Sequence, residues 1–531
     1  MTGWDYAVNF LLYLQCLLTV RFATGNTCST NLTTCSVATT TGRIVGDCSN
    51  PTLYKYFSIP YAKPPIGDLR LEDPISFTQN STVLIQGNEL PSYCPQIGNS
   101  DESEDCLYLN IWSPSSLSIS RPVLFWIHGG SNLLGSGSDP YFEGTKFASS
   151  QNVVIVTYNY RLGLLGYFDD NDNTNFAIKD TIMALKWVQD NISRFGGNKN
   201  LVTVFGNSSG GAIIRALMSS SKANGLFQRA IIQSDPDGYG FNERSFSNGY
   251  LTAKFLEMLG CDDKACVKTK SISDIVTAQL SVASTQINPL QYPKVNIASI
   301  IAPIIDGDLI IKDYWEYVNS GSLPSGVDTI VGFTKDEGGA AINTLLPSAL
   351  TAESAINTAY YLLGVDRASY LLASNVFPFN TYTGDGRSIL ANISTDLLWR
   401  CPTQYISRRI VETKMRNIYL YQLNKGIQYS TNINYPLCTN AVCHQDDIPL
   451  TFGNYPSGTS TDLQSLSLSI QTAWAKFAKY GYPQTCGSIS WPKALTTSNL
   501  NICQFGSNSL LASVTPNECQ VFDSIKYPFQ L

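Results

Sequence analysis

The sequence predicts an α/β fold in which one large, mostly parallel, twisted sheet carries helices on both faces. Near-continuous apolar runs at residues 122–127 and 153–159 are typical of strands that are buried on both faces of a sheet. A β-rich run, a tight Gly-x-Ser-x-Gly turn and a helix-forming run follow one another at residues 201–220. Strand and helix patterns alternate along most of the chain, which favours a doubly wound sheet.

The same patterns place the remaining elements. Apolar runs predict further strands at residues 43–45, 53–61, 107–112, 202–205, 229–233, 329–333 and 418–423. Apolar residues at helical spacing predict helices at residues 176–192, 250–259, 272–284, 352–363, 387–398 and 462–479. Because the chain shows no internal repeat, low-complexity tract or linker, we expect residues 26–531 to form a single domain.

Composition and charge exclude several classes of protein. Of the 531 residues, 44% are hydrophobic, which excludes wholesale disorder. Only 14% are charged, against a usual ~25%. The net charge of −6 comes without any run of five like charges, so we expect no nucleic-acid partner. Glycans would help to keep such a sparsely charged surface soluble.

Residues 1–25 are predicted to be a signal peptide. Residues 7–20 are mostly apolar, are too few to span a bilayer and are followed by the small residues Ala23 and Gly25. A basic stretch before the apolar run is missing, so a buried first helix is the alternative. No later segment reaches ~18 apolar residues, so we expect no transmembrane anchor. The chain would then be secreted or delivered to the lumen of an endomembrane vesicle.

Four Asn-x-Ser/Thr sequons lie in polar contexts and predict surface glycosylation of a secreted chain, at Asn31, Asn80, Asn191 and Asn392. Asn207 also satisfies the rule. A glycan there would block the Gly-x-Ser-x-Gly turn, so we do not expect Asn207 to be modified.

The chain has 14 cysteines and two histidines. Several cysteines lie close together in the sequence, namely Cys28 and Cys35, Cys94 and Cys106, Cys261 and Cys266, and Cys438 and Cys443. No cluster has the spacing of a zinc site with histidines, so we expect no bound metal. Small disulfide loops formed in an oxidising compartment are the better interpretation.

The turn at Ser208 is a candidate for a catalytic nucleophile. A serine at the tip of so tight a turn is held in strained backbone geometry, and the small residues Gly206 and Gly210 fit on either side of it. The hydroxyl then lies over a helix N-terminus, where backbone N–H groups can meet a developing negative charge. The alternative is an ordinary Gly/Ser-rich loop, but the strand before the turn and the helix after it favour catalytic geometry.

A serine nucleophile needs a base, and the chain offers two histidines. His128 directly follows the predicted strand at 122–127 and precedes Gly129 and Gly130, which is the position of an oxyanion loop. His444 lies late in the chain, outside any strong periodic run, where a loop can present it to a site. A surface histidine would be the ordinary interpretation, but the lack of other histidines favours His444 as the base.

The third catalytic group should be a carboxylate that orients the imidazole. Asp336 and Glu337 lie in a turn just after the predicted strand at 329–333. The order serine, acid, histidine along the chain is that of the α/β-hydrolases. The residues alone do not decide between Asp336 and Glu337, and a solvated turn without a catalytic role is the alternative.

The chain resembles the type-B carboxylesterases, the cholinesterase-like branch of the α/β-hydrolases, from residue 42 to about residue 519. The resemblance rests on the motifs at residues 59–70, 103–112, 159–163, 184–192, 195–197, 205–211 and 335–338, and on Phe477, Gly481 and Pro483. It implies Ser208 as nucleophile, Glu337 as acid, His444 as base and no cofactor. It places the oxyanion-hole amides on Gly130, Ser131 and Ser209.

The resemblance also implies disulfides Cys94–Cys106, Cys261–Cys266 and Cys401–Cys519, and structural ion pairs Arg70–Glu104 and Arg161–Asp180. We add one inference that is not a trait of the family, namely that a disulfide between Cys438 and Cys443 would clamp the loop that carries His444.

Three departures from the family pattern bear on function. Ser131 replaces the third glycine of the oxyanion loop, and losing one oxyanion donor typically costs ~10²–10³ in rate. Asn207 replaces an acidic residue that helps cholinesterases with cationic substrates, and the loop between Cys94 and Cys106 contains no tryptophan, which argues against a choline esterase. We expect hydrolysis of small neutral carboxylic esters; the alternative is a non-hydrolytic or weakly active binding, adhesion or storage protein.

Overall fold

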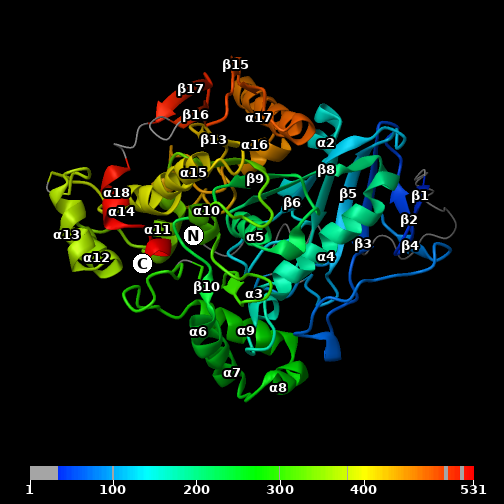
Figure 1. Cartoon of the computed structure of the whole chain (residues 1–531), viewed down its shortest axis with the longest axis horizontal. Helices are drawn as coiled ribbons and strands as arrows, with labels where there is room; N and C mark the ends of the chain where they lie inside the picture. The colour runs from blue at the N-terminus through cyan, green and yellow to red at the C-terminus, as the bar shows by residue number, and fades with distance from the viewer. Residues whose placement is uncertain (1–33, 99–100, 298, 380, 495–499, 515–518) are drawn as a thin grey trace, which may run out of the picture.

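A computed structural model of the chain describes residues 34–98, 101–297, 299–379, 381–494, 500–514 and 519–531. In these residues a 13-stranded sheet follows the order β1-β2-β3-β5-β7-β6-β8-β9-β12-β13-β16-β17, with β4 paired to β2. The sheet runs through the molecule and helices lie on both sides of it (Figure 1). The predicted α/β-hydrolase fold class is therefore confirmed.

The strands of the large sheet are β1 Thr34–Thr39, β2 Gly42–Asp47, β3 Leu53–Pro60, β4 Leu84–Gln86, β5 Tyr108–Pro114, β6 Arg121–Ile127, β7 Val154–Tyr158, β8 Gly197–Asn207, β9 Arg229–Gln233, β12 Asp328–Thr334, β13 Ile418–Leu423, β16 Leu500–Phe505 and β17 Leu510–Val514. Two short pairs are β10 Asn242–Glu243 with β11 Ile304–Ile305, and β14 Thr485–Cys486 with β15 Ile489–Ser490.

The α-helices are α2 Thr145–Gln151, α3 Gly163–Tyr167, α4 Phe176–Asn191, α5 Ser209–Met218, α6 Arg244–Phe246, α7 Ala253–Leu259, α8 Lys264–Thr269, α9 Ile272–Ala283, α10 Tyr314–Ser320, α11 Gly338–Leu345, α12 Ala352–Leu363, α13 Val365–Ala373, α14 Arg387–Thr395, α15 Cys401–Thr413, α16 Ile448–Phe452, α17 Thr461–Tyr480 and α18 Gln520–Ile525.

The middle of the sheet is parallel and its edges are antiparallel. Strands β7, β6, β8, β9, β12, β13 and β16 pair in parallel, whereas β1, β2, β3 and β5 at one edge and β17 at the other pair antiparallel along the sheet, with the short β4 parallel to β2. The carboxyl ends of the parallel strands consequently lie at one edge of the sheet, where the loops that follow them can build a site.

Strand β6 shows why its sequence is apolar throughout. Val123 and Phe125 pack into the core that also holds residues of α4 and α5. Leu124 and Trp126 point to the opposite face and pack with residues of α2, α16 and α17. Because successive side chains of a strand alternate between faces, a strand covered on both sides has no polar face.

Most predicted elements are present. The structure has the strands at 229–233 and 418–423 and the helix at 352–363 with the predicted bounds. The helix predicted at 250–259 begins earlier, in a π-helical turn at Ser247–Thr252. Strands β1, β16 and β17 were not predicted, because their polar and mixed sequences lack a clear alternation and gain their pairing from neighbours distant in the chain.

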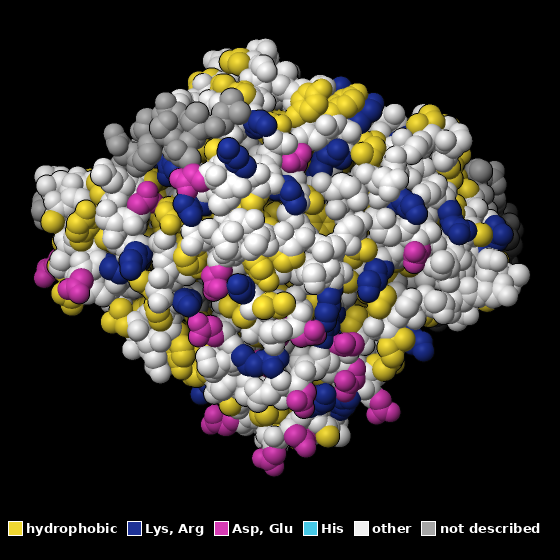
Figure 2. All heavy atoms as spheres, viewed as in Figure 1, with side chains coloured by type: hydrophobic (Ala, Val, Ile, Leu, Met, Phe, Trp, Pro, Cys, Tyr) yellow, Lys and Arg dark blue, Asp and Glu magenta, His cyan; other side chains and the backbone are white. Residues whose placement is uncertain are grey.

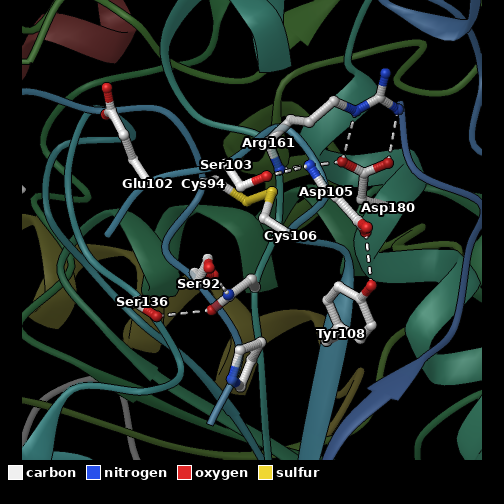
Figure 3. Close-up of a disulfide and its surroundings, with 12 residues drawn as sticks. Ser92, Cys94, Glu102, Ser103, Asp105, Cys106, Tyr108, Ser136, Arg161 and Asp180 are labelled. Carbon is white, nitrogen blue, oxygen red and sulfur yellow. Dashed lines mark hydrogen bonds and ion pairs between the residues drawn. A yellow bond between two sulfur atoms is a disulfide. The ribbon is translucent and has the colours of Figure 1, made fainter. Parts of the chain in front are cut away.

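Six disulfides join described cysteines, and they include Cys94–Cys106, Cys261–Cys266 and Cys401–Cys519. The others are Cys35–Cys48, Cys438–Cys443 and Cys486–Cys503. The Cys94–Cys106 disulfide lies near the ion pair of Arg161 with Asp180, whose nearest atoms are 2.6 Å apart (Figure 3). Arg70 and Glu104 form a second largely buried pair at 2.7 Å. Removing one partner of such a pair would leave a buried charge uncompensated.

The sequons have different surroundings. Asn80 and Asn392 are exposed, whereas Asn31 lies outside the described residues, as does the predicted signal at 1–25. The prediction of a glycan on Asn191 is wrong. Asn191 is fully buried in the last turn of α4, and its side-chain amide donates to Thr40 and to the backbone of Trp187. A glycan on that nitrogen is incompatible with this packing. Among the described residues, no helix has the length and hydropathy needed to cross a bilayer.

Candidate active site

The turn between β8 and α5 holds Ser208 in a strained conformation. Its φ of +58° and ψ of −127° are rare for a residue with a side chain. The turn is also crowded by the end of β6, because a Cβ on Gly206 or Gly210 would lie 2.7 or 2.1 Å from the carbonyl oxygen of Ile127. Only glycine fits at both flanking positions, as the motif predicts. Ser208 lies at the tip of this turn and lines a cavity.

His444 contacts Glu337. Nδ1 of the imidazole is 2.6 Å from Oε2 of Glu337, and Oε1 of this fully buried carboxylate accepts the Thr334 N–H at 2.7 Å. Burial by itself would lower the pKa of His444, but the charge and hydrogen bond of Glu337, together with the charges of Asp447 and Asp446, raise the pKa above 6.5. The His444 side chain keeps 17% of its surface exposed, so the ring can still meet a ligand.

Asp336 has a different contact. Its N–H donates to the carbonyl of Val442 and its Oδ2 accepts the Val442 N–H, both at 2.9 Å. Asp336 therefore fastens the loop after β12 to the loop that carries His444. Of the two carboxylates that the sequence left open, Glu337 is the one that touches the imidazole.

The loop that carries His444 is held on several sides. The Cys438–Cys443 disulfide ends one residue before the histidine, and both cysteines are fully buried. Asp446 accepts the Cys443 N–H at 2.8 Å through Oδ2. Asn432 donates to the His444 carbonyl at 2.7 Å. These contacts fix the backbone on both sides of the ring.

Ser208 and His444 line the same cavity, and the imidazole lies beside the ring of Trp399, with centroids 5.6 Å apart. Within the described residues, the structure records no hydrogen bond between the Ser208 hydroxyl and the imidazole. Hydrogen bonds between a nucleophile and its base are often long without substrate and tighten in the reacting complex.

The loop after β6 presents backbone amides beside Ser208. Gly130 has a φ of +113°, and a Cβ there would lie 2.2 Å from the Leu134 carbonyl oxygen, so glycine is required. Ser131 follows with a φ of +59°, which lies in the left-handed region that favours glycine. Ser131 thus has the backbone conformation expected of the glycine that it replaces. Together with Ser208, Ser131 and Ser209 line the cavity. In the described part of the chain, no group accepts the N–H of Gly130, Ser131 or Ser209.

His128 is a structural residue. The ring is buried, stacks on Tyr160 with centroids 4.4 Å apart and lies with Nδ1 2.8 Å from the Gly129 carbonyl. Burial lowers the pKa of His128 to about 4, so the ring is neutral near pH 7. It packs inside the loop after β6, so His444 is the histidine of the site that can titrate near neutral pH.

Asp447 is a neighbour of the site that the sequence analysis missed. It is buried, and it accepts hydrogen bonds from Gln233 at 2.6 Å and from Asn207 at 3.3 Å. The carbonyl of Gln233 in turn accepts the Ser208 N–H at 2.9 Å. Burial raises the pKa of Asp447 to about 6. The adjacent acids after His444 were the only signal in the sequence, and nothing in their spacing linked them to the serine turn.

The cavity has a volume of about 1060 Å³ and a largely apolar lining. No Asp or Glu is among its described lining residues, and the charged side chains there are His444, Arg215 and Arg367. Arg215 is paired with Asp235 at 2.5 Å, and Arg367 donates to two backbone carbonyls of residues 525 and 526. The cavity therefore suits a neutral, lipophilic ligand. Among the described residues, no group of three His, Cys, Asp or Glu could hold a metal ion.

A serine on a turn between a central parallel strand and a helix, with an acid and a histidine from later loops, defines an α/β-hydrolase. Known proteins extend this assignment. The model of the carboxylesterase family matches residues 33–522. Para-nitrobenzyl esterase of Bacillus subtilis (strain 168) is 32% identical over 490 residues, which cover 86% of this chain and 92% of that protein.

Crystal protein of Dictyostelium discoideum is 30% identical over 496 residues, covering 89% of this chain and 88% of that protein. A solved structure of a PNB esterase superposes with a TM-score of 0.77 at 29% identity, covering 92% of this chain and 99% of the other. The chain belongs to the carboxylesterase family.

Proposed function

We propose that this chain hydrolyses small neutral carboxylic esters by an acyl-enzyme route on Ser208. The observation that carries the proposal is the 2.6 Å contact of His444 with a fully buried Glu337, in a loop that opens into the cavity lined by Ser208. A carboxylate that is buried against one imidazole nitrogen fixes the tautomer and leaves the other nitrogen to act as a base.

In the first step the Ser208 hydroxyl attacks the ester carbonyl carbon, and His444 takes the hydroxyl proton through Nε2. Glu337 stabilises the imidazolium that forms. The amides of Gly130, Ser131 and Ser209 hold the negative oxygen of the tetrahedral intermediate. The alcohol leaves with the proton from His444. Water then attacks the acyl-serine with His444 again as base, and the carboxylic acid is released.

We also propose that the chain works outside the cytosol, in a secretory compartment or beyond it. Six disulfides between described cysteines support this, because such bonds persist in oxidising environments. The predicted signal at residues 1–25 would direct the chain there, and glycans at the exposed Asn80 and Asn392 would be added on the way.

A non-hydrolytic binding or storage protein is the second candidate. The serine at position 131, where esterases of this family carry glycine, favours it. A relative of similar overall length, Crystal protein of Dictyostelium discoideum, has a name that states no hydrolytic activity. In that case the protein would bind a ligand in the cavity without hydrolysing it.

Turnover of a soluble ester separates the two candidates. We expect the wild-type chain to hydrolyse 4-nitrophenyl butyrate and Ser208→Ala to lose at least 10³-fold in kcat/KM, with an unchanged thermal midpoint. Because the serine occupies a strained turn that alanine tolerates equally well, folding should not suffer. A well-folded wild-type chain that turns over no ester at any acyl length would overturn the proposed hydrolysis.

A further inference from the structure

Exposed apolar side chains gather at the mouth of the cavity. Five of them form what we call the mouth rim, with exposed fractions of 69% for Val365, 62% for Ile433, 59% for Leu290, 54% for Tyr361 and 41% for Leu345. Single exposed apolar residues need no explanation, but a contiguous group marks an interaction surface.

The two sides of the mouth rim are each held together by contacts. A Cβ built on Gly364 would lie 3.2 Å from Cδ2 of Leu290, so Leu290 packs at the junction of α12 and α13, beside Val365. On the other side, the hydroxyls of Thr344 and Tyr435 are 3.2 Å apart, which joins the end of α11 to the segment that carries Ile433.

The mouth rim is continuous with the cavity. Leu290, Leu345 and Tyr361 line the cavity and also reach solvent. The remaining two members sit next to lining residues in the chain, since Ile433 follows Asn432 and Val365 is two residues beyond Leu363. An apolar path consequently runs from the outer surface to the chamber that holds Ser208.

The charges near this path restrict the partner. The cavity lining has no carboxylate among described residues, and its two arginines are bound to protein groups. The exposed Asp366 and the part-exposed Arg367 follow Val365 directly and carry opposite charges, so this part of the rim has no net charge to attract a charged surface. A neutral apolar surface is the partner that fits. At the left of Figure 2, where Figure 1 places α12 and α13, hydrophobic side chains lie among both acidic and basic ones.

We propose, resting on the ester hydrolysis proposed above, that the mouth rim docks on aggregates of neutral lipophilic esters, such as an emulsion droplet. The ester would then pass from the aggregate into the cavity without crossing water. Docking buries apolar surface that is otherwise exposed, and this supplies the driving force. Esters that aggregate would therefore be the preferred substrates, although dissolved esters can still enter the cavity.

The test compares soluble and emulsified tributyrin, a neutral triester, across its solubility limit. We expect the wild-type rate to rise beyond the limit, well above the plateau reached with dissolved ester. In the double variant Val365→Asp, Ile433→Asp, the rate on emulsified tributyrin should fall about tenfold, because two apolar side chains no longer enter an apolar phase. Neither side chain lines the cavity, so the rate on dissolved ester should stay within twofold.

Leu84→Asp is the matched control, because Leu84 is 60% exposed on β4, at the end of the molecule opposite α12 and α13 (Figure 1). An emulsified rate that falls equally in the control and the rim variant would overturn the proposal, as would a wild-type rate that does not rise beyond the solubility limit. A rim variant that only dissociates a wild-type dimer in sedimentation would assign the rim to a second copy of the chain instead. If the wild type hydrolyses no dissolved ester, the proposed function itself is refuted, independently of the docking proposal.

Discussion

Replacing Glu337 by glutamine removes one charge at the centre of the site and keeps the shape of the side chain. The carboxylate lies 2.6 Å from His444 Nδ1 and has no exposed surface, so water cannot replace it. A charge-assisted hydrogen bond of this kind contributes about 3 kcal/mol, which corresponds to roughly 100-fold in rate. A glutamine amide can also present its N–H to the ring and favour the wrong tautomer. We therefore expect kcat to fall by about 10³–10⁴-fold.

The pH profile gives the same variant a second, independent readout. The base must be neutral to accept a proton, so kcat/KM rises with pH as His444 loses its proton. In the wild type Glu337 raises the pKa of His444, and the rise should be centred above pH 6.5. Burial of the ring lowers the pKa in both proteins, whereas the opposing charge of Glu337 is lost in the variant, so the rise should move to lower pH.

Stopped-flow and steady-state assays with 4-nitrophenyl butyrate between pH 5 and 9 measure both effects. Asp336→Asn is the control, because that neighbouring carboxylate bonds the Val442 backbone and does not touch the ring. The reasoning is refuted if both variants lose the same activity, or if Glu337→Gln leaves the position of the pH profile unchanged.

Two further variants test the loops around the serine. Ser131 already adopts the backbone conformation of a glycine, so Ser131→Gly should change kcat/KM by less than about tenfold; a gain of 10²–10³ would mean that an oxyanion donor is missing in the wild type. Cys438→Ser, Cys443→Ser should cost about 2 kcal/mol in unfolding free energy and also lower kcat, because the loop before His444 loosens. Cys261→Ser, Cys266→Ser closes an equal loop remote from the serine and should lower stability alone, as read by denaturant melts beside the esterase assay.

The sequence predicted the parallel centre of the sheet well, because strands such as β6 must be apolar on both faces and this leaves a continuous apolar run. The turn at Ser208 was predicted equally well, because crowding against the Ile127 carbonyl admits only glycine at positions 206 and 210. Both features leave a pattern in residues that are close together in the chain, although the contacts that require the pattern come from distant segments.

Features that depend on distant residues were not predicted from pattern. Asn191 looked like a surface sequon until its amide was found bonded to Thr40, 151 residues away. Asp447 joins Asn207 and Gln233 across more than 200 residues, and no local spacing signals that contact. The choice of Glu337 over Asp336 likewise needed the path of the chain around His444.

The most direct test of the central claim is labelling of the chain with an ester-like fluorophosphonate, followed by peptide mass spectrometry. A serine activated by His444 and Glu337 should take up one label, on the peptide that contains Ser208, and His444→Ala should abolish the labelling while the fold is kept. Label that is absent from Ser208 in folded protein, or that persists undiminished in His444→Ala, would contradict the account.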